Sequence, residues 1–331
     1  MRTNTTFVFF AYGKLFIHHR TLFCIYSLFA SNSIKATDTI LIYTDDILFY
    51  TDKFPFKNIE FIKIDKEYIN TVLGDIDLIH KFKIFIIDNA FKIFPNNNVF
   101  YMDSDTFAMK NLRNVIDSIS SKSSIMHLYE FNFFEHNTNN KKDISSLFFA
   151  NFYEIIIKEH TPNQNIKNIN SYNAGVIGID SSNKNILKEV FDLTEKSYKA
   201  IQHHAAEQFS FSYLLSKYTT INFCSVEVYH YWPKVEKQIM DKFLNQLFTN
   251  TFFSSTTEKQ LSKVKKATLM LPNYIKNHKL MLEDNAIQFF CTKEYSKAYK
   301  ETIKALFKGA IFDTVFLKDV IYYTKKKLTH E

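Results

Sequence analysis

The sequence predicts an α/β fold, with a mostly parallel sheet flanked by helices, followed by a C-terminal helical extension. Short apolar runs alternate with segments of helical periodicity over the first two-thirds of the chain, and this alternation is typical of parallel strands joined by helices. Hydrophobic residues make up 46% of the 331 residues, which is enough for a substantial core. After about residue 234 only Lys- and Phe-rich segments at helical spacing remain. We therefore expect one domain over residues 1–234 and a helical extension over residues 235–331.

The first expected elements follow from local signals. Apolar runs bounded by turn residues predict strands, and apolar residues three or four positions apart predict helices. In chain order these are a strand at Phe7–Phe10, a helix at Ile17–Ser31, a strand at Thr39–Tyr43, a helix or turn at Phe49–Phe56, a strand at Ile59–Ile64 and a helix at Leu78–Phe94. Pro95 ends the last helix, because proline cannot continue one.

The remaining elements are assigned in the same way. Polar, Asn-rich segments at Thr138–Asp143 and Thr161–Asn170 predict loops. The later α/β elements are a strand at Tyr172–Ile179, helices at Lys184–Lys199 and Ala205–Lys217, and a strand at Phe223–Tyr229. The extension contains helical runs at Lys237–Phe248, Glu258–Leu271, Asn285–Phe307 and Ile311–Lys325.

Two carboxylates follow the apolar run Val99–Met102, which predicts a buried strand. Asp103 and Asp105 come at its C-terminal end, and in an open α/β sheet ligands bind in the crevice outside the strand C-termini. Carboxylates there can hold Mg²⁺ or Mn²⁺, which bridge to substrate phosphates. The alternative is an acidic turn, since Asp and Ser are ordinary turn residues. The order of helix, tight loop, buried strand and Asp-x-Asp favours the metal site.

Three further stretches accompany the segment Lys81–Asp105. Phe7–Lys14 ends in Ala-Tyr-Gly-Lys, Ser171–Gly178 contains Asn-Ala-Gly, and Ala206–Phe209 contains Glu-Gln. Taken in chain order, these four segments resemble the nucleotide-sugar glycosyltransferases of the GT-A fold, and they look most like the bacterial group similar to glycosyltransferase families 8 and 32. The resemblance covers about residues 7–232. It implies a Rossmann-like catalytic domain over residues 1–234. It also implies a hexosyltransferase-type reaction, in which a sugar moves from a nucleotide diphosphate sugar to a glycan or glycolipid acceptor.

The resemblance also implies roles for individual residues. Asp103 and Asp105 would bind Mn²⁺ or Mg²⁺, with Asp103 also contacting the donor, and His230 is the candidate for a third ligand. The alternative for His230 is a hydrogen-bonded histidine without a metal. The remaining residues expected to contact the donor are Tyr12, Gly13, Lys14, Asp45, Lys83, Ala174, Gly175 and Lys234.

Three polar residues are expected to act on the reacting sugars. Asn173 can both donate to and accept from sugar hydroxyls. Glu207 would be a general base or, with Gln208, a polar anchor of the reacting sugar. The alternative for Glu207 is an acid that only favours the start of a helix. Lys81 and Lys83 could send one positive side chain to the diphosphate or donor, and the alternative is that both are solvated helix charges.

Composition and missing motifs argue against several classes of protein. The chain has only five glycines and neither Gly-x-Gly-x-x-Gly nor a P-loop, which disfavours dinucleotide-binding and P-loop enzymes. Three cysteines without a Cys-x-x-Cys pair argue against a zinc site and fit a reducing cytosol. No secretory signal is visible, and the apolar run Thr21–Ala30 is too short to span a bilayer. We expect a cytoplasmic protein.

The net charge of +7 comes largely from the C-terminal third. No nucleic-acid motif accompanies it, so we expect no nucleic-acid partner. Residues 306–323 contain Lys308, Asp313, Lys318 and Asp319 and so cannot be a simple membrane span. With Lys325–Lys327 they instead predict an amphipathic helix in peripheral contact with the anionic inner face of a membrane. The alternative is a helix that buries its Phe stripe in the protein and has a solvated basic end.

A rival to catalysis is a non-catalytic glycosyltransferase-like protein that serves as a binding or interaction module. The joint presence of Asp103, Asp105, Asn173 and Glu207 speaks against it, because a structural domain needs none of them.

Overall fold

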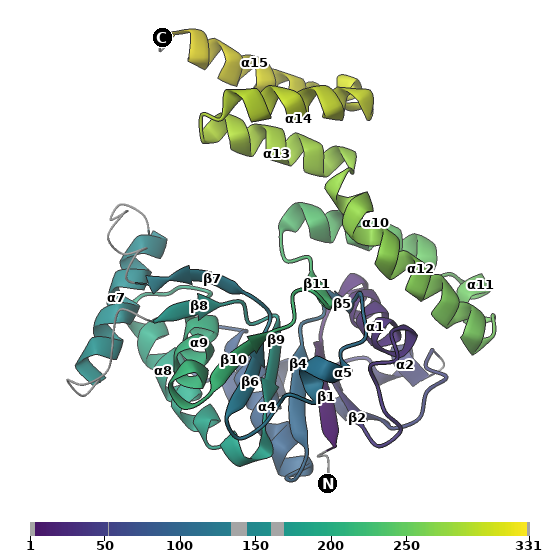
Figure 1. Ribbon diagram of the computed structural model, residues 1–331, viewed down its shortest axis with the longest axis vertical. Helices are drawn as coiled ribbons and strands as arrows, with labels where there is room; N and C mark the ends of the chain where they lie inside the picture. Colours follow the sequence, from purple (N-terminus) through teal and green to yellow (C-terminus); the bar gives the residue numbers. More distant parts are fainter. Residues whose placement is uncertain (1–3, 52, 134–143, 160–168, 330–331) are drawn as a thin grey trace. The chain divides into compact units, whose positions relative to one another are not determined.

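The computed structural model describes residues 4–51, 53–133, 144–159 and 169–329, in two compact units, Met1–His230 and Tyr231–Glu331. The first unit combines strands and helices, and the described part of the second is helical (Figure 1). The loop predicted at Thr138–Asp143, and that at Thr161–Asn170 up to residue 168, lie outside the described residues.

A seven-stranded sheet of order β10-β6-β9-β4-β1-β2-β3 forms the middle of the first unit. Its strands are β1 (Thr5–Ala11), β2 (Thr39–Thr44), β3 (Ile59–Lys63), β4 (Asn98–Met102), β6 (Ser123–Met126), β9 (Val176–Ile179) and β10 (Thr220–Phe223). The pairs β1–β2, β1–β4, β2–β3 and β6–β10 are parallel, whereas β9 runs antiparallel to both β4 and β6. The prediction of a mostly parallel sheet is confirmed.

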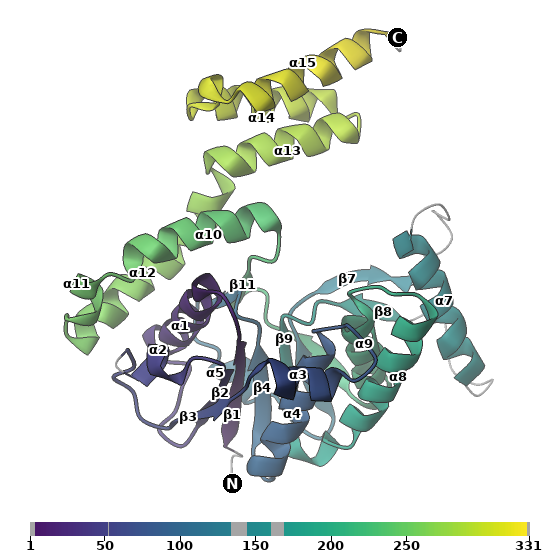
Figure 2. The same ribbon diagram turned by 180° about the vertical axis from the view of Figure 1, so that it is seen from behind.

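Helices cover both faces of this sheet, as the opposite views of Figures 1 and 2 show. Strand β1 is apolar on both sides for this reason, and Phe7, Val8 and Phe9 have no exposed surface. The helices are α1 (Leu15–Ala30), α2 (Ile47–Thr51), α3 (Lys66–Leu73), α4 (Lys81–Ile93), α5 (Arg113–Ile116), α7 (Ile144–Glu159), α8 (Ile186–Ala200) and α9 (Ala206–Tyr218). The predicted α/β fold is thus confirmed.

Two predicted strands are each divided in the structure. The run Tyr172–Ile179 contains the end of β8 (Asn170–Tyr172) and all of β9, because residues 173–175 form a turn between them. The run Phe223–Tyr229 is interrupted by a turn in which Val228 N–H donates to the carbonyl of Cys224. After that turn, β11 (Val228–His230) pairs with β5 (Thr106–Ala108) rather than joining the main sheet. Strand β7 (Tyr129–Asn132) pairs with β8 in a further two-stranded sheet.

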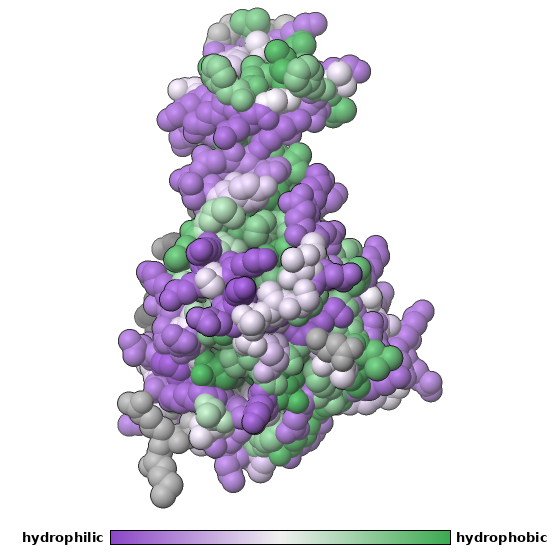
Figure 3. Space-filling model, turned by 90° about the vertical axis from the view of Figure 1, so that its right-hand side faces the viewer, coloured by the Kyte–Doolittle hydropathy of each residue, from purple (hydrophilic) through white to green (hydrophobic). Residues whose placement is uncertain are grey.

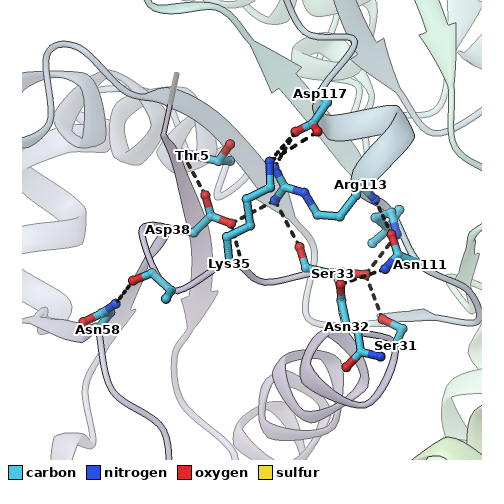
Figure 4. Close-up of polar contacts among 12 residues, drawn as sticks. Thr5, Ser31, Asn32, Ser33, Lys35, Asp38, Asn58, Asn111, Arg113 and Asp117 are labelled. Carbon is cyan, nitrogen blue, oxygen red and sulfur yellow. Dashed lines mark hydrogen bonds and ion pairs between the residues drawn. The ribbon is translucent and has the colours of Figure 1, made fainter. Parts of the chain in front are cut away.

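A polar cluster joins β1, the segment between α1 and β2, and α5 (Figure 4). Asp38 is 1% exposed, and its carboxylate accepts from Thr5 N–H at 3.1 Å and from Arg113 Nη1 at 2.8 Å. Lys35 pairs with the more exposed Asp117 at 2.9 Å. The buried carboxylate of Asp38 therefore depends on one guanidinium for its counter-charge.

We expect Arg113→Met to lower the free energy of unfolding by about 3–5 kcal/mol, because it leaves the buried Asp38 carboxylate without its cation while keeping the apolar stem. The matched change Lys35→Met removes a partly exposed pair and should cost under about 1 kcal/mol. Urea unfolding followed by circular dichroism compares the two variants. Equal losses in both would contradict this account of the cluster.

The second unit consists of helices separated by short turns. They are α10 (Lys234–Leu247), α11 (Asn250–Phe253), α12 (Thr257–Lys276), α13 (Lys279–Cys291), α14 (Tyr295–Phe307) and α15 (Thr314–Thr329). The predicted run Asn285–Phe307 is divided between α13 and α14 at a turn where Lys293 has a positive φ of 61°. Among the described residues, no helix is both long and apolar enough to cross a membrane.

Candidate active site

The two aspartates of the Asp-x-Asp motif are held in a tight turn after β4. Asp103 N–H donates to the carbonyl of Gly175 at 2.8 Å, and Thr106 Oγ1 donates to the carbonyl of Asp103 at 2.7 Å. Asp105 is buried, with 7% of its surface exposed, while Asp103 is half-buried. Tyr101 Oη donates to Asp103 Oδ1 at 2.6 Å. The turn therefore fixes both carboxylates at the C-terminal edge of the sheet.

The pairing of β5 with β11 brings a histidine to this turn. His230 lies opposite Thr106 in the register, and its Nε2 is 3.3 Å from Asp105 Oδ1. One ligand atom from each of Asp103, Asp105 and His230 lies within 4.8 Å of the other two. The structure thus brings together the three predicted metal ligands. Two carboxylates and one imidazole suit a divalent cation such as Mn²⁺, which accepts oxygen ligands.

Asn173 sets the orientation of the His230 ring. His230 Nδ1 lies 2.8 Å from Asn173 Oδ1, and that oxygen also accepts from Gly175 N–H at 3.0 Å. An Nδ1–H donor in this bond leaves the Nε2 lone pair facing Asp105, as a metal ligand requires. A side chain at position 175 would collide with the ring, since an added Cβ would lie 2.3 Å from His230 Nδ1. Gly175 is therefore needed for the close approach of the histidine.

Sequence reasoning missed Glu130, a residue of β7 that connects several predicted site residues. Its carboxylate accepts from Asn173 Nδ2 at 3.1 Å and from Gln208 Nε2 at 2.7 Å. Gln208 in turn accepts from Ala174 N–H at 3.3 Å. A single acid in a short strand carries no local signal, so only the tertiary pairing of β7 with β8 could have identified it.

Lys83 lies between two carboxylates and is 6% exposed. Its Nζ is 3.3 Å from Asp103 Oδ1 and 3.3 Å from Glu207 Oε1. Burial opposes the charge, but the two carboxylates outweigh it and raise the Lys83 pKa. The alternative that Lys81 and Lys83 remain solvated is therefore wrong. Lys81 is also buried, and its Nζ pairs with Glu195 at 2.6 Å instead.

Glu207 lies in the first turn of α9 and is 2% exposed. Burial raises the pKa of its carboxyl group to about 7, although the Lys83 ammonium opposes this shift. A carboxyl group with such a pKa can gain or lose a proton near neutral pH, which is the property required of a general base.

The predicted nucleotide-binding residues gather at the ends of β1 and β2. Gly13 has a φ of +99°, and its N–H donates to the Asp45 carboxylate at 3.0 Å. The ring of Tyr12 is stacked with Phe10, and Lys14 is exposed at the start of α1. Because β2, β1 and β4 are parallel neighbours, these residues and Asp103 follow strand ends at the same edge of the sheet.

One predicted donor contact falls in the other unit. Lys234 is the first residue of α10, and its contact with the donor stays a prediction. A buried histidine, His18, was not predicted. Its Nε2 lies 3.4 Å from Asp45 Oδ1, and its Nδ1 lies 3.2 Å from the hydroxyl of Tyr50.

Comparison with known proteins gives no match to a family model and none to a curated protein. Among solved structures, the chain is similar to the glycosyltransferase GlyE of Streptococcus pneumoniae TIGR4, with 12% identity and a TM-score of 0.46, over 81% of this chain and 64% of GlyE. It is similar to the galactosyltransferase LgtC in complex with donor and acceptor sugar analogues, with 11% identity and a TM-score of 0.47, over 74% of this chain and 96% of LgtC. It is also similar to mouse xyloside xylosyltransferase 1, with 10% identity and a TM-score of 0.43, over 67% of this chain and 85% of that enzyme. The chain therefore spans less than two-thirds of the length of GlyE.

Proposed function

We propose that the first unit is a glycosyltransferase of the GT-A type, which transfers a sugar from a nucleotide diphosphate sugar to a glycan or glycolipid acceptor. The observation that carries this proposal is the convergence of Asp103, Asp105 and His230 at the C-terminal edge of a mostly parallel sheet. The segment that carries Asp103 and Asp105 also resembles nucleotide-sugar enzymes in sequence. A cation held there would act as a Lewis acid on the departing diphosphate.

The other site residues orient the proposed metal ligands or contact the substrates. Asn173 holds the imidazole of His230, and Glu130 holds Asn173. Lys83 places a positive charge beside Asp103, where it can attract the donor diphosphate. Glu207 lies on the other side of Lys83 and can accept the proton of the attacking acceptor hydroxyl or anchor the reacting sugar.

The nucleoside part of the donor is assigned to the ends of β1 and β2. Gly13 and Asp45 are joined there by a hydrogen bond, and Tyr12 offers an aromatic face to a base. The sugar itself is assigned to the turn at Ala174 and Gly175, because small residues let the backbone approach it.

The cellular role proposed is assembly of surface polysaccharide or lipopolysaccharide at the cytoplasmic side of the membrane. The support for it is the sequence resemblance to the bacterial group. A non-catalytic role is disfavoured, because burying Lys83 and Glu207 costs desolvation energy that a merely structural domain could avoid with apolar residues.

Chelation tests the metal dependence of the proposed function. We expect a panel of nucleotide sugars with Mn²⁺ to include one whose nucleotide diphosphate is released, and EDTA to abolish this release. Added Mn²⁺ or Mg²⁺ should restore it, because a site rich in carboxylate oxygens prefers these ions. Release that survives thorough chelation would remove Asp103, Asp105 and His230 from the role of metal ligands.

A further inference from the structure

The turn between α14 and α15 exposes large apolar side chains. Phe307 and Phe312 are each 88% exposed, Val315 is 69% exposed and Ile311 is 60% exposed. The same segment does have a core, since Phe316 is 5% exposed and packs in a cluster with residues of α13 and α14. The fold of this unit therefore buries one phenylalanine here and leaves two in water.

This exposure is unfavourable for a surface that meets only water. Apolar side chains gain free energy when they leave water, and four large exposed ones lie here within nine positions. Contiguous apolar surface rimmed by polar residues usually marks an interaction site. On the C-terminal helices in Figure 3, green hydrophobic surface lies directly beside purple hydrophilic surface.

Lysines border these apolar residues in the sequence. Lys304 and Lys308 are exposed near the end of α14, and Lys318 is exposed in the first turns of α15. The second unit contains 18 lysines against ten acidic residues, a net charge of +8, whereas the whole chain carries +7. The positive charge of the protein therefore lies in the unit that carries the exposed phenylalanines.

We propose that the α14–α15 turn docks on an anionic lipid surface, with Phe307, Ile311, Phe312 and Val315 in the interfacial layer. The flanking lysines then lie at the level of the negatively charged headgroups. Aromatic residues with neighbouring lysines suit this boundary, because it is apolar on one side and anionic on the other. This inference concerns the second unit and does not depend on the proposed sugar transfer.

The sequence suggested one amphipathic helix over residues 306–323 together with Lys325–Lys327, whereas the structure divides this segment between α14 and α15. The run Lys325–Lys327 lies near the C-terminal end of α15, whereas the exposed phenylalanines lie before its N-terminal end. Attraction through lysines alone is lost at high salt, because salt screens exposed charges. Apolar insertion is much less sensitive to salt, so the two modes can be separated.

The test is sedimentation of the full chain with vesicles of phosphatidylcholine, with and without about one-quarter phosphatidylserine. We expect the full chain to bind the anionic vesicles, and Phe307→Ser/Phe312→Ser to weaken this binding by about 10²-fold. The control Leu269→Ser, at a residue of α12 that is 67% exposed, should bind like the parent. We expect only the salt-sensitive part of the vesicle binding to fall in the triple variant Lys325→Gln/Lys326→Gln/Lys327→Gln.

A spectroscopic readout gives independent evidence for insertion. Trp232 is the one tryptophan of the chain, so Trp232→Phe/Phe312→Trp carries a single reporter in the turn. Its emission should shift to the blue with anionic vesicles, and lipids brominated on the acyl chain should quench it. A parent chain that ignores the vesicles, or a double serine variant that binds as tightly as the parent, would overturn the proposal. Self-association that the serine variant abolishes, without vesicle binding, would assign the turn to a second copy instead.

Discussion

Replacing Asp105 by alanine is expected to lower metal-dependent turnover of the nucleotide sugar by about 10³-fold. A divalent cation acting on a departing phosphate contributes several kcal/mol, and each factor of ten in rate corresponds to about 1.4 kcal/mol. Asp105 is the buried carboxylate of the three-ligand cluster, and its Oδ1 faces His230 Nε2 at 3.3 Å. Its removal should weaken Mn²⁺ binding directly, which electron paramagnetic resonance of free Mn²⁺ measures without any substrate.

The fold should survive this change, because Asp105 lies in a turn after β4 and His230 keeps its bond to Asn173. Asp88→Asn serves as the matched control, since that carboxylate lies on the outer side of α4 and pairs with Lys92. The control should retain the turnover and the Mn²⁺ affinity of the parent. Unchanged Mn²⁺ affinity in Asp105→Ala would rule out Asp105 as a ligand.

Glu207→Gln is expected to reduce sugar transfer by about 10²-fold or more while donor binding persists. The amide keeps the shape of the side chain but can neither accept a proton as a base nor carry a charge. Activity of the parent should also fall as the pH drops through about 7, because the Glu207 pKa lies near this value and protonation removes the carboxylate. In the glutamine variant this dependence should be absent from the pH–rate profile.

Glu195→Gln is the matched control for this second change. Glu195 also pairs with a buried lysine of α4, Lys81, but it lies on α8 and contacts none of the predicted metal ligands. A general effect of breaking a Lys–Glu pair would appear in both variants. Equal transfer rates in Glu207→Gln and the parent would reduce Glu207 to an acid that only favours the start of α9.

The sequence was sufficient for the parts of the site that depend on local pattern. The apolar run that ends before Asp103 predicted a buried strand with its acids at one end, and β4 is buried along its whole length. The helix before it was equally clear from its periodicity and from Pro95. These signals are local because strand burial and helix termination are decided within a few residues.

Tertiary contacts determined what local pattern could not. Lys81 and Lys83 are two positions apart on one helix, yet one pairs with Glu195 and the other with Asp103. The turn at Asn173 resembles a strand in sequence because apolar residues follow it directly. The antiparallel direction of β9 and the convergence on Glu130 likewise depend on chain reversals that no local pattern encodes.

Because β5 pairs with β11, the candidate site can be completed only late in folding. Residues 106–108 can pair only once residues 228–230 have been synthesised. Asp105 and His230 therefore come together only after the whole first unit has left the ribosome. Contacts between positions so far apart in sequence raise the contact order and slow folding. An ion bound by all three side chains would stabilise the complete native unit over any truncated or partly unfolded one. Catalytic competence would then report directly on whether the first unit has finished folding.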